Sequence, residues 1–468
     1  MVTKKILETT GFNLYQEDIR PKELAEKVLH KYYEKDPLVE DLPIDPFNIL
    51  RAAGSKFLLL DFDRIDGFYM LPQNSDDIGM VGLNKKRPIE RIRFSCAHEL
   101  CHHLKDNKSS ESRQGVRDEI EVYSNQFATH LLMPNHLVQE LIKRKGISNF
   151  EKDFEKIFEV SLLFGVSLQA MSIKICNLIG ERFEQKLYNK LRNKLKPKTK
   201  KNDYDISLDY ILFKQLIDGY DFIQLTEVSP VKLKNDFLRH VITHDHMIEN
   251  GHVTEERISE ILAIIRIENT EELEKIKLNE NEIEVIGQYE MYSKLFDSFE
   301  ISDTYDLLTQ LHKEFYKYAP YPEVGGMFRE APARISGTHV ATTDPYLIPT
   351  ETIDTCSSYD TSKAELVGNS LQIELIIKTH HKLTVIHPFI DGNGRTLRAL
   401  ANYQLVAQTM PPVFLKLKDK DEYRQHLARM DNIDNNQSRH EYLTRFLIKE
   451  IILSYDNILT ANTNETFE

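Results

Sequence analysis

The feature that most constrains how this chain folds is the stretch from His387 to Arg395, which reads His-Pro-Phe-Ile-Asp-Gly-Asn-Gly-Arg. Apolar residues spaced three and four apart precede it from Ile373 to Leu383, and similar spacing follows it from Leu397 to Leu405. That period predicts an amphipathic helix on each side. The stretch is therefore predicted to be a loop joining two helices, although Asp-Gly and Asn-Gly pairs taken alone would favour a β-hairpin turn.

This loop combines groups that suit phosphate chemistry. Gly392 and Gly394 bracket Asn393, so the backbone can adopt positive φ values that turn consecutive N–H groups toward one point. Such groups bind anions at the start of a helix. Asp391 offers a carboxylate oxygen of the kind that binds Mg²⁺ together with substrate phosphates. His387 is the group in this loop that can take up a proton near pH 7.

Two arginines stand in the first turn of the helix predicted after the loop. Arg395 and Arg398 are three residues apart and share one helix face. A cation at this position opposes the helix macrodipole by about 0.3 to 1 kcal/mol. An anionic ligand would remove that conflict, so the sequence predicts an anion-binding site here.

Taken together, these residues resemble the Fic motif, whose family transfers AMP from ATP to a protein hydroxyl. The resemblance implies that His387 deprotonates a Ser, Thr or Tyr hydroxyl, that Asp391 binds Mg²⁺ and that Phe389 anchors the loop. Glycine at position 394 is typical of the AMP-transferring majority, whereas the phosphorylating Doc branch has lysine there. The implied ligands of the ATP phosphates are Gly392, Asn393, Gly394, Arg395 and Arg398.

Two further segments resemble regulatory and docking elements of Fic proteins. Asp245 to Gly251 is similar to an inhibitory helix, [Ser/Thr]xxxE[Gly/Asn], in which Glu249 would pair with Arg398 and keep it from the γ-phosphate. Asp245 departs from this motif, because Ser or Thr is usual there, and an exposed acidic helix is the alternative interpretation. The stretch from Ile335 to Pro349 would be the flap that aligns a target protein by strand pairing.

A second motif, His98-Glu99-Leu-Cys-His102, matches HExxH. Two histidines at i and i+4 project from one helix face and can bind a single Zn²⁺, while Glu99 can act as general base for a metal-bound water. Glu121, on a following predicted helix, is the predicted third ligand, and Glu119 is the weaker alternative. A histidine-rich surface helix without a metal is the competing interpretation.

From about Pro21 to Leu178 the chain resembles the ImmA/IrrE metallopeptidases. The segments RFSCAHELCHHL and EVYSNQFATHLLMP are similar to the family's RFxxAHELxH and ExxAN-x-FAxxLLMP. The resemblance implies the zinc ligands and base just named, and cleavage of a regulatory protein. Ser124 and Cys101 replace the usual Ala and Gly, and both are small. His103 follows the second histidine directly, which points it away from the site by about 100°.

Composition sets outer limits on function. The 468 residues are 41% hydrophobic and 28% charged, as in an ordinary soluble globular protein. The net charge of −13 argues against nucleic acid as a general partner, because phosphate binding requires clustered basic residues. Four scattered cysteines predict no disulfide framework, and apolar runs of about 18 residues are missing. We therefore expect a cytoplasmic protein without a membrane segment; a homo-oligomer is compatible with this.

The predicted fold is mostly α-helical and has two parts. An N-terminal α+β zincin-like domain with a small sheet covers residues 1–182, a basic linker covers 183–205, and an all-α Fic domain with a short hairpin flap covers 206–468. The inhibitory helix lies near 243–251, and the catalytic loop is 387–395. Strands are predicted at Lys56–Phe62, Gly67–Leu71 and Met80–Leu83, and helices in the second part at Tyr210–Ile217, Glu255–Ile267, Ile283–Phe299 and Tyr305–Tyr316.

The main hypothesis is an autoinhibited protein AMP transferase, acting on a target or on itself, fused to a zinc peptidase-like domain. Such a pair would suit a stress-response or toxin–antitoxin system. One alternative makes the N-terminal half a non-catalytic sensor that controls the Fic domain. Another makes the chain a protease-type transcriptional or stress regulator. The turn from Leu163 to Ser167 resembles a helix-turn-helix, but Leu168 to Ile175 offers few polar groups for reading bases.

Overall fold

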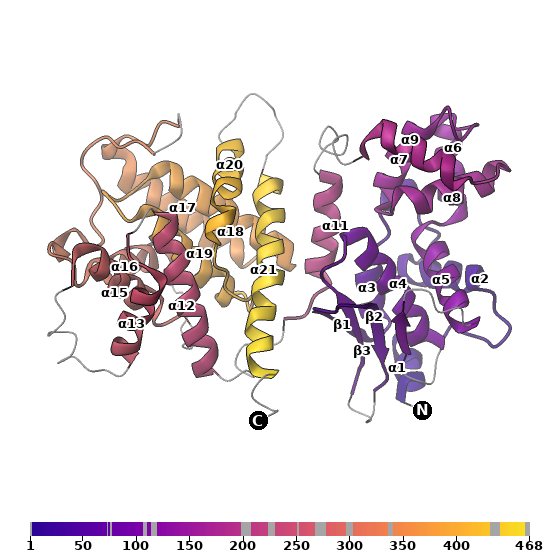
Figure 1. The fold of residues 1–468 in the computed structure, drawn as a ribbon, viewed down its shortest axis with the longest axis horizontal. Coiled ribbons are helices and arrows are strands. Elements are labelled where there is room, and N and C mark those ends of the chain that lie inside the picture. The colour runs from indigo at the N-terminus through magenta and orange to yellow at the C-terminus, as the bar shows by residue number, and fades with distance from the viewer. Residues whose placement is uncertain are drawn as a thin grey trace. The chain divides into compact units, whose positions relative to one another are not determined.

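The computed structural model describes residues 2–72, 74, 77–105, 110–113, 119–197, 207–222, 230–249, 252–266, 278–295, 303–335, 340–430 and 440–463. The chain divides into two compact units, Met1–Asp221 and Phe222–Glu468 (Figure 1). No single helix in this described part is long and apolar enough to cross a membrane. The helices Phe154–Phe164 and Leu168–Ile179, which form a bent pair, reach that length and composition only jointly.

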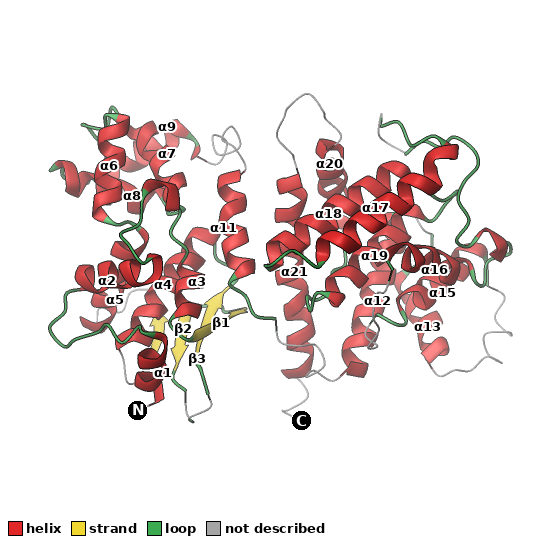
Figure 2. Cartoon of the chain, turned by 180° about the vertical axis from the view of Figure 1, so that it is seen from behind, coloured by secondary structure: helices red, strands yellow, loops and turns green. Residues whose placement is uncertain are grey.

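The first unit contains a four-stranded sheet of order β1-β3-β2-β4. Figure 2 labels β1, β2 and β3. Strand β3 pairs parallel with β1 and antiparallel with β2, and β4 pairs antiparallel with β2. Phe57, Val81 and Tyr69 are register partners across three strands and are all buried. The three predicted strands are present with slightly shifted ends. The strands are β1 (Ser55–Leu60), β2 (Ile65–Met70), β3 (Gly79–Asn84) and β4 (Ser110–Arg113).

Helices make up the rest of the first unit. Helix α4 contacts β2 and β3 on one side and α5 on another, while α2 also packs on α5. Helix α3 begins where the Asp45 carboxylate accepts the Phe47 and Asn48 N–H groups, which caps its first turn. The helices are α1 (Val2–Thr10), α2 (Pro21–Tyr33), α3 (Pro46–Ala52), α4 (Ile89–Lys105), α5 (Glu119–Leu132), α6 (Asn135–Lys145), α7 (Phe154–Phe164), α8 (Leu168–Ile179), α9 (Gln185–Leu195) and α11 (Ser207–Asp218).

Helix α11 belongs to the first unit, so the division between units lies later in the chain than the predicted linker at 183–205. Fully buried Arg93 donates to the Gln215 side chain of α11, and Gln215 donates in turn to the Pro43 carbonyl at 2.6 Å. A buried guanidinium needs such acceptors, which explains why α11 docks here. Residues 198–205 of the predicted linker lie outside the described residues.

The second unit is helical, and its described residues add only isolated β-bridges. Helix α18 contacts α17, α19 and α21, and the helices predicted from Glu255, Ile283 and Tyr305 onward are present. The helices are α12 (Pro230–Ile248), α13 (Glu255–Arg266), α15 (Glu280–Tyr292), α16 (Thr304–Tyr316), α17 (Ile348–Lys363), α18 (Asn369–Ile386), α19 (Asn393–Ala407), α20 (Lys420–Met430) and α21 (His440–Thr463). Short 3-10 helices lie at Val39–Asp41, Pro322–Val324, Pro345–Leu347 and Leu417–Asp419.

The core of the second unit fixes both ends of the loop at 387–395. Leu383 and Ile386 of α18 are buried before the loop, and Leu397 and Leu400 of α19 are buried after it. Leu383, Leu397 and Leu400 belong to the apolar helix faces predicted from the sequence. Because both flanking helices are packed into one core, the loop between them has little freedom to move.

Part of the predicted flap is described. Arg334 and Ala341 form an isolated antiparallel bridge, and the Thr342 hydroxyl donates to the Ala333 carbonyl at 2.7 Å. The predicted flap, Ile335 to Pro349, therefore begins beside a strand-like pairing. Residues 336–339 lie outside the described residues.

Candidate functional site

The backbone of the candidate loop has a positive φ at two residues, His387 and Gly392. His387, which ends α18, has a left-handed conformation with φ of 53°, and its N–H donates to the Leu383 carbonyl at 2.9 Å. Gly392 has φ of 74° and stands immediately before α19. Positive φ is uncommon for a residue other than glycine, so other contacts must hold His387 in place.

Arg329 supplies those contacts. Its guanidinium donates to the carbonyls of His387 at 2.7 Å, Thr343 at 2.6 Å and Ile386 at 3.2 Å. Its backbone N–H donates to the Pro388 carbonyl at 2.9 Å, and the residue is buried. A cation that satisfies several carbonyls ties the end of α18 to the segment that leads into the flap.

Contacts between Phe389 and His312 hold the loop against the core of the second unit. The Phe389 ring is fully buried and stacks on the His312 ring, with centroids 3.8 Å apart. The Gly326 N–H donates to His312 Nδ1 at 2.8 Å, so the ring proton is on Nε2, which donates to the Asp391 carbonyl at 3.0 Å. Burial lowers the pKa of His312 to about 4, which keeps this bridge neutral.

Asn393 shapes the loop through its side chain. Its amide accepts the Phe389 N–H at 2.9 Å and donates to the Phe389 carbonyl at 2.8 Å. Both side-chain groups are therefore engaged within the loop. The group that Asn393 can still offer to an anion is its backbone N–H at the start of α19.

His387 is the first residue of the loop. Burial, reinforced by the charge of Arg329, lowers the pKa of its imidazole below the usual value. The ring is therefore neutral at pH 7 and can accept a proton. The Asp391 carboxylate, on the same loop, is largely exposed and lies 3.8 Å from Arg395.

Arg395 is nearly buried and has protein partners. It forms an ion pair of 2.5 Å with Glu284 of α15, and its guanidinium lies 4.5 Å from the centre of the Phe315 ring. Its Nε atom is buried and has no hydrogen-bond partner among the described residues. A buried donor of this kind fits an anionic ligand.

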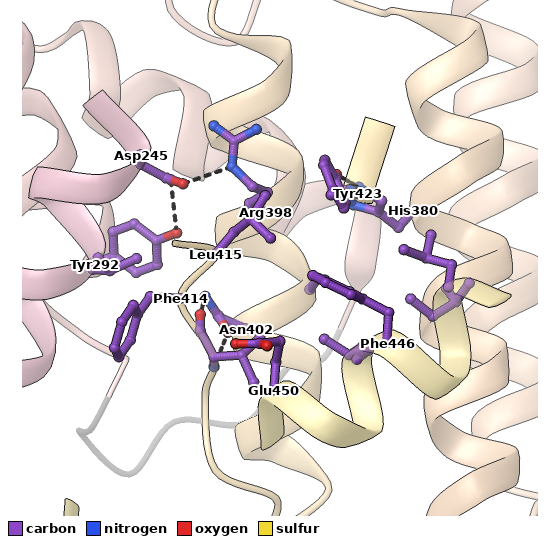
Figure 3. Close-up of a pocket in the computed structure, with 16 residues that line it drawn as sticks. Asp245, Tyr292, His380, Arg398, Asn402, Phe414, Leu415, Tyr423, Phe446 and Glu450 are labelled. Carbon is purple, nitrogen blue, oxygen red and sulfur yellow. Dashed lines mark hydrogen bonds and ion pairs between the residues drawn. The ribbon is translucent and has the colours of Figure 1, made fainter. Parts of the chain in front are cut away.

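Arg398 is held by two carboxylates from the end of α12. Its Nε lies 2.7 Å from Asp245, and one terminal nitrogen lies 2.8 Å from Glu249 (Figure 3 shows Asp245 and Arg398). Burial would raise the pKa of Glu249, but the charge of Arg398 and the hydrogen bond to it lower it overall. Glu249 can therefore neutralise Arg398, whereas burial raises the pKa of Asp245 in spite of the opposing charge of Arg398. Asn250 and Gly251, which complete the predicted inhibitory motif, lie outside the described residues.

The Glu249 carboxylate also lies over the start of α19. A Cβ atom built on Gly394 would stand 2.6 Å from a Glu249 oxygen and 3.0 Å from a terminal nitrogen of Arg398. Glycine at this position therefore leaves room for an anionic group directly beside the loop. Glu249 fills that room in this structure.

In the first unit, three predicted metal ligands converge. His98 and His102 of α4 have Nε2 atoms 3.1 Å apart, and Glu121 of α5 reaches them at 3.2 Å and 3.5 Å. The ligand atoms of these three residues all lie within 4.8 Å of one another. Burial alone would raise the pKa of Glu121, but both histidines lower it to about 2. Two imidazoles and a carboxylate at this spacing suit a tetrahedral metal with an open position.

The neighbouring candidates do not join that cluster. Glu119 is exposed, whereas His103 is buried and contacts the Tyr69 hydroxyl and the Ala53 carbonyl, each at 2.9 Å. Glu99 is fully buried, and its carboxylate lies close to Gly67 of β2.

The turn that resembles a helix-turn-helix joins α7 and α8, which are bent by 114°. Ser172 and Lys174 are buried, so two of the three polar groups of α8 considered for reading bases do not face solvent. Gln169 is exposed and hydrogen-bonds to Gln185. The helix therefore packs within its own unit.

Several supporting residues were not identified from the sequence. Arg329, His312 and Glu284 come from segments far from the loop in sequence, and no motif spacing links them to it. Asp245 was noticed only as a departure from the inhibitory motif. Its acidic side chain, four residues before Glu249, was the available signal, because residues at i and i+4 share a helix face.

Comparisons with known proteins match both units. Residues 301–405 match the model of the Fic/DOC family, and residues 57–175 match the model of the IrrE N-terminal-like domain. "Protein adenylyltransferase Fic" of Nematostella vectensis is 42% identical over 62 residues, 13% of this chain and 14% of that protein. "Protein adenylyltransferase fic-1" of Caenorhabditis elegans is 45% identical over 51 residues, 11% and 10% of the respective chains. The chain thus aligns with only a small part of these relatives.

Solved structures of Fic proteins also align with the chain. A Fic-1 fragment from C. elegans covers 70% of this chain and 94% of its own, with 17% identity and a TM-score of 0.40. A Fic domain containing signaling protein from Bacteroides thetaiotaomicron covers 52% and 95%, with 18% identity and a TM-score of 0.41.

Proposed function

We propose that the chain is an autoinhibited protein AMP transferase, because residues 301–405 match the Fic/DOC family and residues 57–175 match the IrrE N-terminal-like domain. Its second unit would move AMP from ATP to a Ser, Thr or Tyr hydroxyl of a target protein or of the chain itself. The observation that carries the proposal is the loop, which has a neutral imidazole at one end and the start of α19 with two arginines at the other.

The residues of this loop fit a magnesium nucleotide. Arg395 has a buried donor without a partner, and the Glu249 carboxylate, itself an anion, already lies at the start of α19 beside Arg398. The backbone N–H groups at Gly392, Asn393 and Gly394 would bind the phosphates, with Arg395 and Arg398 on the distal ones. Asp391 would hold Mg²⁺, which neutralises phosphate charge when bound.

The reaction follows from these positions. His387 accepts the proton of the target hydroxyl while the hydroxyl oxygen bonds to the α-phosphorus of ATP. The bond to the β-phosphate oxygen breaks, so diphosphate leaves and AMP stays on the protein. Such a transfer depends on positioning and on neutralising spreading negative charge, which the two arginines supply. The flap near Ile335 to Pro349 would present the target segment by strand pairing.

Autoinhibition follows from Glu249. Its carboxylate takes a nitrogen of Arg398 that a terminal phosphate needs, at 2.8 Å. An arginine already bound to carboxylates has fewer donors left for phosphate. ATP would therefore be held unproductively, or not at all, until Glu249 moves.

The test uses ATP labelled at either the α- or the γ-phosphate. With Glu249→Gly protein and Mg²⁺, α-label should appear on protein and γ-label should not. His387→Ala in the same background should remove the α-label. Transfer of γ-label would instead identify a kinase and overturn the proposal. Mass spectrometry of a treated lysate would identify the acceptor side chain.

For the first unit we propose a zinc-dependent peptidase that cleaves a regulatory protein. His98, His102 and Glu121 fit Zn²⁺ because two imidazoles and a carboxylate converge from two helices. Zinc, when bound, supplies a water whose pKa is about 7. Glu99, which follows His98, would take the proton of that water. Metal analysis before and after chelation, together with repressor cleavage by wild type and Glu99→Gln, tests this.

The alternative for the first unit is a sensor without peptidase activity. Its metal would be structural or absent, and the control that the first unit exerts on AMP transfer would be the same in wild type and in the Glu99→Gln protein. We further infer a cytoplasmic location, since all four cysteines are free and buried, as a reducing compartment would leave them.

A further inference from the structure

We propose that Asp245 is a positioning residue for Arg398, with a role opposite to that of Glu249. Glu249 blocks the phosphate-binding edge of the arginine, whereas Asp245 would hold the other edge so that the guanidinium keeps facing the loop after Glu249 leaves. This inference rests on the proposed function, because it assigns Arg398 to a phosphate of ATP.

The three nitrogens of Arg398 have different neighbours. Nε lies 2.7 Å from Asp245 Oδ1, and one terminal nitrogen lies 2.8 Å from Glu249 Oε1. The other terminal nitrogen lies 3.0 Å from the Cβ position built on Gly394. The terminal nitrogens therefore face the loop and the inhibitory carboxylate, while Nε is tied to Asp245.

The two carboxylates differ in how far they are enclosed. The Asp245 side chain is 2% exposed, and the Glu249 side chain is 31% exposed. Tyr292 donates to the second oxygen of Asp245 at 3.5 Å (Figure 3). An exposed carboxylate at a helix end can move aside for a phosphate, whereas one surrounded by side chains cannot leave without a cost in desolvation.

The cavity behind Arg398 also distinguishes the two carboxylates, because Asp245 lines it and Glu249 does not. It has a volume of about 60 Å³, and Asp245, Tyr292 and Arg398 line it together with mainly apolar residues, among them Phe414 and Phe446 (Figure 3). Neither Glu249 nor any residue of the loop at 387–395 lines it. Asp245 thus contacts Arg398 from the interior, on the side away from the loop.

These contacts predict what each carboxylate does to nucleotide binding. Removing Glu249 frees one terminal nitrogen, while Nε stays bound to Asp245 and the guanidinium keeps its direction. Removing Asp245 leaves the long, flexible Arg398 side chain without this partner. Phosphate binding must then order that side chain, which costs conformational entropy and weakens the affinity. Asp245 should therefore strengthen the binding of ATP in the released enzyme, although it is an anion beside a phosphate site.

The test measures Mg-ATP and AMP affinity in the full chain by calorimetry, with Glu249→Gly as the reference background. Adding Asp245→Asn, which removes the charge, or Asp245→Ser, which also shortens the side chain, should weaken ATP binding about tenfold or more, as expected when a charge-assisted hydrogen bond is lost. AMP has no distal phosphate, so its affinity should change less than twofold. Tyr292→Phe is the matched control, because it keeps the ion pair and should weaken ATP binding only slightly.

Two results would overturn the inference. One is unchanged ATP affinity in both Asp245 variants, provided that thermal melting shows both to be folded. The other is that Asp245→Asn alone raises AMP transfer as Glu249→Gly does, which would make Asp245 a second inhibitory group. If the Glu249→Gly reference binds ATP but transfers no AMP, the proposed function fails while the effect of Asp245 can still be read.

Discussion

The two candidate sites differ in how their charged groups are balanced. In the first unit, the His98 and His102 imidazoles and the Glu121 carboxylate converge on one point. When the imidazoles are neutral, these groups can bind an added cation. In the second unit, Arg398 already has Asp245 and Glu249 as partners. A metal can therefore bind the first site by addition, whereas a phosphate can bind the second only by displacing a carboxylate.

That difference separates binding from regulation. A site filled by addition depends on ligand concentration alone, because no protein group has to leave. A site filled by displacement contains its own competitor, and any change that moves the competitor changes the apparent affinity. The second unit should therefore respond strongly to single substitutions that leave its fold intact.

The largest expected effect would break the assignment of the second site altogether. His387→Ala, in the Glu249→Gly background, should lower AMP transfer about 10²- to 10⁴-fold, because it removes the proton acceptor. The affinity for Mg-ATP, measured by calorimetry, should stay within a few-fold. A variant that keeps full transfer would show that another group takes the proton.

The next prediction tests whether ATP binds the second site by displacing Glu249. Glu249→Gly should raise the affinity for Mg-ATP about 10- to 100-fold, since a hydrogen bond to a charged group is worth about 1.5 to 3 kcal/mol. Glu249→Gln keeps the shape without the charge and should fall between wild type and Glu249→Gly. The zinc content of the first unit, measured by elemental analysis, should be the same in all three. Equal ATP affinity in the three proteins would contradict displacement.

A metal experiment probes addition at the first site. Zinc at about 100 times its Kd should stabilise the first unit by about 2.7 kcal/mol, and a chelator should reverse this. His102→Asn should lose most of the effect, whereas His103→Asn, outside the cluster, should still gain stability from zinc. Thermal melting with and without zinc is the measurement. An ATP affinity that falls on chelation would show that the sites are coupled.

The smallest effect concerns the support of the loop. The folded pKa of His312, about 4, lies below its usual 6.5, so the unfolded chain binds more protons between these values. Stability should therefore fall as the pH drops from 6.5 toward 4, by on the order of 1 to 2 kcal/mol after allowing for partial solvation. Hydrogen exchange at the Gly326 amide should report this first. His312→Gln should show a flatter dependence on pH.

Local sequence placed the sites better than their surroundings. The loop between α18 and α19, the helix carrying His98 and His102, and three strands follow from spacing within a few residues. The groups that hold the loop could not be predicted, because Arg329 and His312 act on it over 58 and 79 positions of the chain. For a related reason, the structure differs from the prediction that the segment of α11 belongs to the second domain. Its apolar face is visible in the sequence, but its contact with Arg93 is not.

The position of Glu249 has a mechanical consequence. It stands just past Ile248, the last residue of α12, and its N–H makes a final helical hydrogen bond of 3.2 Å to the Asp245 carbonyl. A few residues later, the Val253 N–H donates to the His246 ring at 3.3 Å, which ties this part of the chain to α12. Helix ends fray at little cost. Breaking that final hydrogen bond would let Glu249 turn away from Arg398, while Asp245 and the rest of α12 stay in place.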